Sequence, residues 1–322
     1  TLSGHRTFSG EAFAMGERSP LALINPAAAA RMTVAETLTN LIAADLSALD
    51  RVVLSANWMA AAGGDSEDQA LFDAVTAVGE EFCPALGIAI PVGKDSLSMQ
   101  TRWQHEGVDR RVVSPLTLIV SAFAPVDDVR RTLTPVMQSQ SDSVLVLFEF
   151  GQRRMGGSCV AQVYGQLGDT APDVDDAVAF KALLDWLLDA KRQGLILALH
   201  DRSDGGLITT LLEMAFASRL GLDVAIEASE DLVAALFNEE IGFVAQVEVA
   251  QLAELSAAAP CTVTAVAHLR VDERVLIHHG EELAAEYSRG ELQQLWADTS
   301  YRMQRLRDSE ACADEEFADI LQ

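Results

Sequence analysis

The segment LALHDRSDGGLITTLLEMA (residues 197–215) combines side chains that could bind a phosphate or a metal ion. An apolar run ends at His200, Asp201 and Ser203 follow, and two glycines precede a run with helical spacing. Phosphates and metals bind where a strand ends and a helix begins. Asp201 offers a carboxylate oxygen of the kind that Mg²⁺ takes, and Ser203 can donate to a phosphate oxygen. A helix cap followed by a glycine turn explains the same pattern equally well.

A second candidate is VAETLTN, in which Glu36 and Asn40 are four residues apart on a predicted helix. Both side chains therefore project from one face of that helix. A carboxylate and an amide oxygen placed this way could share a cation with Asp201. Taken without its context, the pattern favours a solvated polar stripe.

The third candidate is PVGKDSLSM, where Gly93, Lys94, Asp95 and Ser96 follow a predicted strand. Lysine binds phosphate as a point charge, and aspartate can act as a metal ligand or a base. The segment is not a P-loop, because the GxxxxGK[ST] spacing is absent. An ordinary charged turn is the simpler interpretation of this motif alone.

Three weaker signals complete the set. Arg153 and Arg154 precede the sequence MGGS, which could bind an anion or form a flexible connection between strands. Asn57 follows an apolar strand and is either ligand-facing or a turn former. His200 ends a buried strand and is better explained as a hydrogen-bonded structural residue than as a base. We find no Ser-His-Asp or Cys-His arrangement.

Composition excludes several classes of function. The 322 residues contain 23 Lys and Arg against 48 Asp and Glu, a formal net charge of −25, and such a surface repels a nucleic-acid backbone. The longest uncharged run has 15 residues and contains two prolines, too short and interrupted for a membrane span, and no signal peptide is visible. The four cysteines are far apart, which argues against a zinc site or a disulfide framework and favours a reducing cytoplasm.

The elements that must position these residues alternate in type. We predict helices at 26–45, 65–87, 177–194, 205–220 and 291–307, and strands at 51–58, 88–92, 112–113, 116–123, 144–150, 159–165, 195–201, 223–226, 242–247, 263–269 and 274–278. This order indicates an α/β or α+β fold. A charged segment at 125–135 separates two apolar blocks, and residues 281–322 carry eleven acidic against four basic side chains, which is typical of a linker or a partner-facing segment.

Six segments resemble one family in order and spacing: GEAFAMGERSP, AETLTN, SANWM, PVGKDSLSM, MGGS and HDRSDGG. They are similar to the second synthetase half of phosphoribosylformylglycinamidine synthase, in the large single-chain form of proteobacteria. The resemblance covers residues 10–280. The acidic tail resembles the segment that leads toward the glutaminase domain of that family.

The resemblance implies a two-domain fold like that of aminoimidazole ribonucleotide synthetase. Residues 1–127 would form the first domain, which contributes strands to a shared barrel and here is expected to lack its opening strand. Residues 128–280 would form an α/β second domain, and residues 281–322 a helical linker. Because the chain begins at Thr1 rather than Met, we expect it to be a piece of a longer protein.

The implied activity is a cytoplasmic C–N ligase of purine biosynthesis that uses glutamine as amido donor. ATP phosphorylates the amide oxygen of formylglycinamide ribonucleotide, and glutamine-derived ammonia displaces the phosphate to give the amidine. The partners would be the other synthetase half and the glutaminase domain. Because these carry further catalytic groups, the chain alone is expected to be inactive.

By the same resemblance, Glu36, Asn40 and Asp201 would ligate Mg²⁺, and Ser203 would contact ATP or ADP. Gly93 to Ser96 would bind nucleotide and substrate in the true active site, with Lys94 and Asp95 in catalytic roles. The family has a further metal-binding aspartate upstream of Thr1, so the expected metal site is incomplete.

Two alternatives stay open. The chain could be a purely structural, nucleotide-stabilised half without turnover of its own. It could also be a related ATP-dependent enzyme acting on selenide, thiamine phosphate or a hydrogenase-maturation substrate, although GEAFAMGERSP and HDRSDGG favour the purine enzyme.

Overall fold

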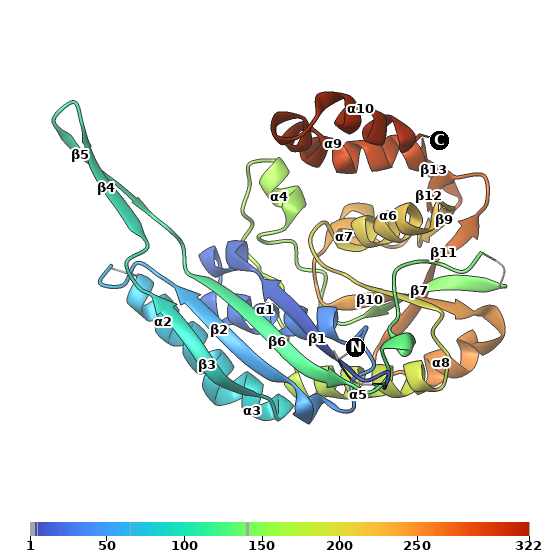
Figure 1. Ribbon diagram of the computed structural model, residues 1–322, viewed down its shortest axis with the longest axis horizontal. Helices are drawn as coiled ribbons and strands as arrows, with labels where there is room; N and C mark the ends of the chain where they lie inside the picture. The colour runs from blue at the N-terminus through green and yellow to red at the C-terminus, as the bar shows by residue number, and fades with distance from the viewer. Residues whose placement is uncertain (1–3, 5, 65, 140–141, 322) are drawn as a thin grey trace.

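A computed structural model describes residue 4 and residues 6–64, 66–139 and 142–321 (Figure 1). The strands are β1 (Gly10–Glu17), β2 (Val53–Met59), β3 (Ala89–Ser96), β4 (Gln100–His105), β5 (Val108–Val113), β6 (Thr117–Val126), β7 (Ser143–Glu149), β8 (Ala198–Asp201), β9 (Gly221–Ile226), β10 (Gly242–Glu248), β11 (Thr262–Arg270), β12 (Arg274–His279) and β13 (Glu282–Ser288). The α-helices are α1 (Pro26–Leu41), α2 (Glu67–Thr76), α3 (Cys83–Leu86), α4 (Cys159–Val163), α5 (Ala177–Arg192), α6 (Gly206–Ser218), α7 (Leu232–Phe237), α8 (Leu252–Ala258), α9 (Arg289–Arg307) and α10 (Glu310–Asp319). Short 3₁₀ segments are η1 (Ser19–Leu23), η2 (Leu49–Arg51), η4 (Val129–Arg131) and η5 (Val249–Gln251), and η3 (Ala77–Phe82) is a π segment between α2 and α3.

The first sheet has the strand order β1-β6-β2-β3, with β2 and β3 parallel and the other pairs antiparallel. Its strands alternate between a buried and an exposed face: in β6, Leu118, Val120 and Ala122 are buried, whereas Phe123 is 46% exposed. The buried side chains join the same apolar core as those of α1. The sheet remains open in this chain. Four strands are too few to close the shared barrel that the family resemblance implies.

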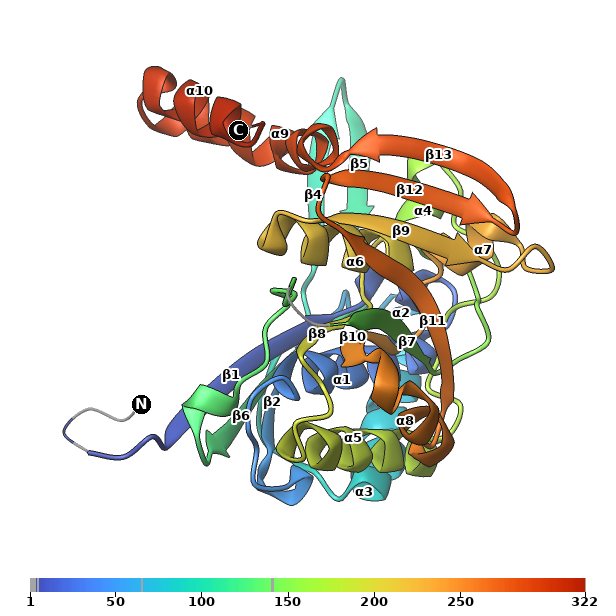
Figure 2. The same ribbon diagram turned by 90° about the vertical axis from the view of Figure 1, so that its right-hand side faces the viewer.

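The second sheet has the order β13-β12-β9-β11-β7-β10-β8 and is antiparallel except between β12 and β9. Alternate residues of β7 enter two different cores: Val146 and Phe148 pack with α5, whereas Leu145 and Leu147 pack with α6. Figure 2 shows α5 and α8 on one side of this sheet and α6 and α7 on the other. Burial on both faces explains why β7 is a nearly continuous apolar run.

Most predicted elements are confirmed, with α5 and α6 within two residues of their predicted bounds at each end. The predicted strand at 159–165 is wrong, because this segment starts the short helix α4. The hydroxyl of Ser158 accepts from the backbone N–H of Ala161, and this cap stabilises a helical turn despite the β-branched residues that follow. Of the hairpin β4–β5, only the end of β5 was predicted, as the strand at 112–113. Strand β3 extends through the GKDS segment rather than ending before it.

The acidic C-terminal segment contributes one strand to the second sheet. It begins with β13, an edge strand of the second sheet, and Ser288 and Glu291 form a capping box at the start of α9. The indole of Trp296 donates to Glu213 on α6 and its ring packs against Phe216. Residues 281–322 therefore include part of the second sheet, and a division of the chain at residue 280 stays a prediction.

A buried lysine joins α5 to the end of α1. Lys191 Nζ donates to the carbonyls of Ile42 (2.6 Å), Ala43 (3.2 Å) and Ala44, which lie past the last turn of α1. A cation at this position satisfies carbonyls that have no partner within the helix. Burial lowers the pKa of Lys191 to about 8, so about 99% of the amine is charged at pH 6.

Among the helices that the structure describes, none combines the length and the apolar character that a membrane crossing requires.

We expect Lys191→Met to lower the free energy of unfolding by about 2 kcal/mol, because three carbonyls lose a charged donor while side-chain volume is kept. Urea unfolding at pH 6 measures this loss. Lys181→Met is the matched control, since Lys181 pairs with Asp185 on the exposed side of the same helix. The control should change stability by less than about 0.5 kcal/mol, and equal losses in both variants would contradict the role of Lys191.

Candidate functional site

The structure brings two of the predicted site residues into direct contact. The hydroxyl of Ser203 donates to Oε1 of Glu36 at 2.6 Å, although 167 residues separate them in the chain. Glu36 lies on α1, which Asn25 caps and which begins with Pro26, and Ser203 lies in the turn between β8 and α6. The contact therefore joins the AETLTN and HDRSDGG segments at one place.

Glu36 is held in a charged but poorly solvated environment. Its Oε2 accepts from the backbone N–H of Glu17 at 2.7 Å, and Nη1 of Arg18 lies 3.9 Å from its Oε1. Burial raises the pKa of Glu36, although Arg18, Ser203 and the Glu17 N–H each favour the carboxylate. A cation close to this carboxylate would act against that burial effect.

The other two predicted metal ligands have different partners. The amide nitrogen of Asn40 donates to the carbonyl of Met15 on β1 at 2.9 Å, which leaves the amide oxygen as the atom that could ligate a cation. Asp201 contacts Nδ1 of His200 at 3.2 Å, and Nε2 of His200 contacts Glu213 at 3.0 Å. Burial lowers the pKa of His200, but these two carboxylates outweigh it and raise the pKa to about 9.

Carboxylate and amide oxygens are the donor set that Mg²⁺ prefers, so the residue types at this place fit that ion. The contacts of Glu36 and Asp201 are with different neighbours, and their joint use as metal ligands stays a prediction.

Sequence reasoning missed Arg18, which is 4% exposed and lies directly after β1. Its Nη1 donates to Oδ1 of Asp204 at 2.8 Å and its Nη2 donates to Oε2 of Glu239 at 3.0 Å. Burial acts to lower the pKa of Arg18, but Glu239, Glu36 and Asp204 outweigh it and raise the pKa. The available signal was the acidic pair Glu239 and Glu240 between an apolar helix and an apolar strand, since buried acids require buried bases.

Glu239 also accepts hydrogen bonds from two backbone N–H groups, one of them in the SDGG turn. Its Oε1 accepts from the N–H of Gly205 at 2.9 Å and from the N–H of Cys159 at 2.8 Å. Gly206 has a φ of +72°, and a Cβ there would lie 2.7 Å from the carbonyl oxygen of Asn238. In this structure the two glycines serve a tight turn and close packing, and the N–H of Gly205 binds a carboxylate of the protein itself.

The arginines before the MGGS segment are also engaged. Arg153 pairs with Glu149 at 2.8 Å and with Glu230 at 3.0 Å, and Arg154 pairs with Glu240 at 2.6 Å. Each guanidinium thus has a carboxylate partner within the chain, which favours the connecting role of this loop over anion binding.

The GKDS segment lies elsewhere, on the edge strand β3. Glu17, Ile119, Asn57 and Lys94 are paired in sequence across β1, β6, β2 and β3, so Lys94 is three strand spacings, about 14 Å, from Glu17. Lys94 is exposed, and its Nζ lies 3.3 Å from Oγ of Ser96. Lys94 therefore lies on the opposite edge of the sheet from Glu17, whose backbone N–H binds Glu36.

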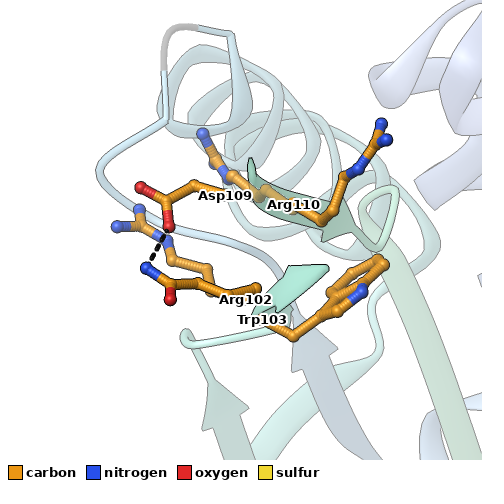
Figure 3. A pocket seen from close by; sticks show the side chains of 6 residues that line it. Arg102, Trp103, Asp109 and Arg110 are labelled. Carbon is orange, nitrogen blue, oxygen red and sulfur yellow. Dashed lines mark hydrogen bonds between the residues drawn. The ribbon is translucent and has the colours of Figure 1, made fainter. Parts of the chain in front are cut away.

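A surface pocket of about 550 Å³ is lined by residues of β4 and β5 (Figure 3). Figure 1 shows this hairpin projecting from the rest of the chain. Figure 3 shows Trp103 beside Arg110, its cross-strand partner. None of the predicted site residues lines this pocket.

Ligand atoms of Cys159, Asp204 and Glu239 lie within 4.8 Å of one another. Both carboxylates already pair with Arg18, so in this cluster a guanidinium supplies the positive charge that a metal ion would otherwise supply. Burial raises the pKa of Cys159 to about 11, and the negative charges of Glu239 and Asp204 add to this effect. Cys159 is therefore a thiol at neutral pH.

Comparison with known proteins assigns the two parts of the chain. Residues 1–125 match the family described as FGAR-AT PurM_N-like domain, and residues 140–278 match the family described as AIR synthase related protein, C-terminal domain. With its two open sheets, the chain has a mixed α/β fold of the AIR synthetase type with these two domains.

Solved structures share this fold at low sequence identity. PurL from T. maritima complexed with FGAR has a TM-score of 0.68 and 14% identity over 88% of this chain and 46% of its own. Phosphoribosylformylglycinamidine synthase II from Thermotoga maritima has a TM-score of 0.66 and 14% identity over 88% and 44%. Thiamine-monophosphate kinase from Stenotrophomonas maltophilia has a TM-score of 0.57 and 16% identity over 87% and 88%. The chain thus spans less than half of the two T. maritima proteins and most of the kinase.

We expect iodoacetamide at pH 8 to label Cys312 first, because it is exposed on α10. Burial raises the pKa to about 11 for Cys83 and to about 12 for Cys261, and Cys159 is also near 11. A thiol with a pKa of 11 is about 0.1% thiolate at pH 8, and its reactivity rises about tenfold per pH unit. Mass spectrometry should show one fast adduct that disappears in Cys312→Ser. A fast adduct that persists in this variant would contradict the expectation.

Proposed function

We propose that the chain is the second synthetase half of a phosphoribosylformylglycinamidine synthase. It would take part in the ATP-dependent conversion of formylglycinamide ribonucleotide to the amidine, with glutamine as amido donor, in the cytoplasm. The observation that carries the proposal is the 2.6 Å contact between Ser203 and Glu36, which joins the two motifs that the resemblance assigned to one nucleotide site. The description of the N-terminal match and the likeness to PurL bound to FGAR support the same activity.

In this proposal Glu36, Asn40 and Asp201 hold Mg²⁺, and Ser203 contacts the nucleotide. The ion would supply positive charge against the phosphates of ATP or ADP. The chain's own residues orient these groups: Glu17 and Ser203 hold the two oxygens of Glu36, and Met15 holds the amide of Asn40. This site serves binding, and no group here needs to attack the substrate.

The reacting groups would meet at the other edge of the first sheet. Lys94 offers a positive charge to a transferring phosphoryl group, Asp95 offers a carboxylate for proton or metal binding, and Gly93 and Ser96 contact the phosphates. All four residues lie on the edge strand β3, where Gly93, Lys94 and Asp95 are exposed. We therefore propose that the other synthetase half completes this site, with ammonia supplied by a glutaminase domain and without a nucleic-acid or membrane partner.

Two other functions remain as alternatives. A structural half would bind nucleotide at Glu36 without turnover anywhere on the chain. A kinase of the same superfamily is favoured by one observation, the match over 88% of a thiamine-monophosphate kinase. Phosphorylation of thiamine monophosphate by the chain would establish the kinase and exclude the synthetase half.

We expect calorimetry to show that ADP binds the chain only when Mg²⁺ is present. Glu36→Ala and Asp201→Ala should weaken this binding by at least about tenfold, since each removes a charged ligand. Ser203→Ala should weaken it by about tenfold, the loss of one hydrogen bond. Asp185→Asn is the control, because it removes a carboxylate on the exposed side of α5. Binding that ignores Mg²⁺ would refute the proposed ligand set.

We further expect no amidine when the chain alone is given ATP, formylglycinamide ribonucleotide and ammonium. Adding a separately produced synthetase half should restore formation, and Lys94→Ala or Asp95→Ala should abolish it while leaving Mg²⁺-dependent ADP binding unchanged. The two readouts separate because Lys94 is about 14 Å across the sheet from Glu17, whose backbone N–H binds Glu36. Detectable amidine from the chain alone would overturn the proposed division of labour.

A further inference from the structure

Glu239 is a buried carboxylate surrounded by donors. It is 3% exposed, and it accepts from the guanidinium of Arg18 at 3.0 Å and from the backbone N–H groups of Gly205 and Cys159 at 2.9 and 2.8 Å. A guanidinium and converging backbone N–H groups are the donors that proteins use to bind phosphate. Here the chain itself supplies the anion.

This position adjoins the candidate nucleotide site. Gly205 is two residues beyond Ser203, which donates to Glu36, and the same Arg18 that binds Glu239 lies 3.9 Å from Glu36. Glu239 would thus lie next to the phosphates of a nucleotide that Ser203 contacts.

The local charge opposes a free phosphate. Glu36, Asp204 and Glu239 place three negative charges around the single positive charge of Arg18, a net charge of −2. Asp204 is exposed, with 72% of its side chain accessible, whereas the other carboxylates are largely buried. A divalent cation would balance this charge, and a nucleotide without one would meet repulsion at short range.

We propose that Glu239 is a built-in anion of this site. Its carboxylate fills a position that would otherwise accept a phosphate, and it thereby makes nucleotide binding depend on a divalent cation. Glu239 is a specificity-determining residue in this role, which rests on the proposed function for the nucleotide that Ser203 contacts.

The test is Glu239→Ala in the full chain, which removes the carboxylate and leaves Arg18 and two N–H groups around a cavity. Formate, acetate or inorganic phosphate should raise the unfolding temperature of this variant by several degrees relative to chloride at equal ionic strength. The wild-type chain and Asp204→Ala should show no such anion-specific gain, because Asp204 is exposed and leaves no buried space. Glu239→Gln, which fills the cavity, should show none either.

Calorimetry provides the second readout: ADP without Mg²⁺ should bind Glu239→Ala and should not bind the wild-type chain. If the anions stabilise the variant but ADP binds neither protein under any condition, the built-in anion is supported and the proposed nucleotide function fails. If wild type binds Mg²⁺ and ADP while the variant shows neither anion rescue nor metal-free binding, the inference is overturned and the proposed function stands.

Should Glu239→Ala fail to fold in chloride, refolding in formate gives the same answer. Recovery in formate alone supports the built-in anion. Failure in both salts, when Asp204→Ala folds in each, overturns it.

Discussion

The buried guanidinium of Arg18 is the interaction on which the candidate site depends. Arg18 directly follows β1, and its guanidinium reaches the turn before α6. It donates to Asp204 and Glu239 and lies 3.9 Å from Glu36. Removing a charge from water is unfavourable unless partners surround it, so this arrangement allows little freedom of geometry. The contact of Ser203 with Glu36 is possible because Arg18 and Glu239 fix the elements on which those residues lie.

The packing of the second sheet, α5 and α1 stabilises this arrangement. Strands β7 and β10 of the second sheet are buried on both faces, and the alternating residues of β7 belong to separate cores with α5 and α6. Lys191 ties α5 to the end of α1, and Arg31 on α1 pairs with Asp173 at 2.6 Å. Because α1 carries Glu36 and is anchored at several points, the carboxylate is presented by a fixed helix rather than a mobile loop.

The open first sheet separates Glu36 from Lys94, so the two residues can belong to different sites. Glu36 lies near β1 and Lys94 on β3, at opposite edges of the four strands. The face away from the helices exposes Phe13, which packs on Phe123 of the neighbouring strand. In the proposed synthetase the other half would cover this face and complete the edge at Lys94, whereas the Glu36 site is built within the chain.

Local patterns in the sequence determined much of this structure. Apolar spacing predicted α1, α5, α6 and most strands, because helix and strand periods are set by neighbours a few residues apart. The same patterns placed Glu36 correctly on a helix and Ser203 in a turn, whereas Lys94 lies within β3 rather than after it. They failed at α4, where one hydroxyl cap outweighed strand propensity, and at β4 and most of β5, whose exposed residues show no clear alternation.

Only the tertiary structure decided which of these residues meet. Arg18 and Glu239 are 221 residues apart, so no local spacing could reveal their pairing. The contact between Glu239 and Gly205 also joins residues that are distant in the sequence. The glycine motif is typical of phosphate binding, but here the N–H of Gly205 donates to the carboxylate of Glu239. Such pairings arise because burial makes an unpartnered charge costly, and the partner is chosen by the packing of distant elements rather than by sequence neighbours.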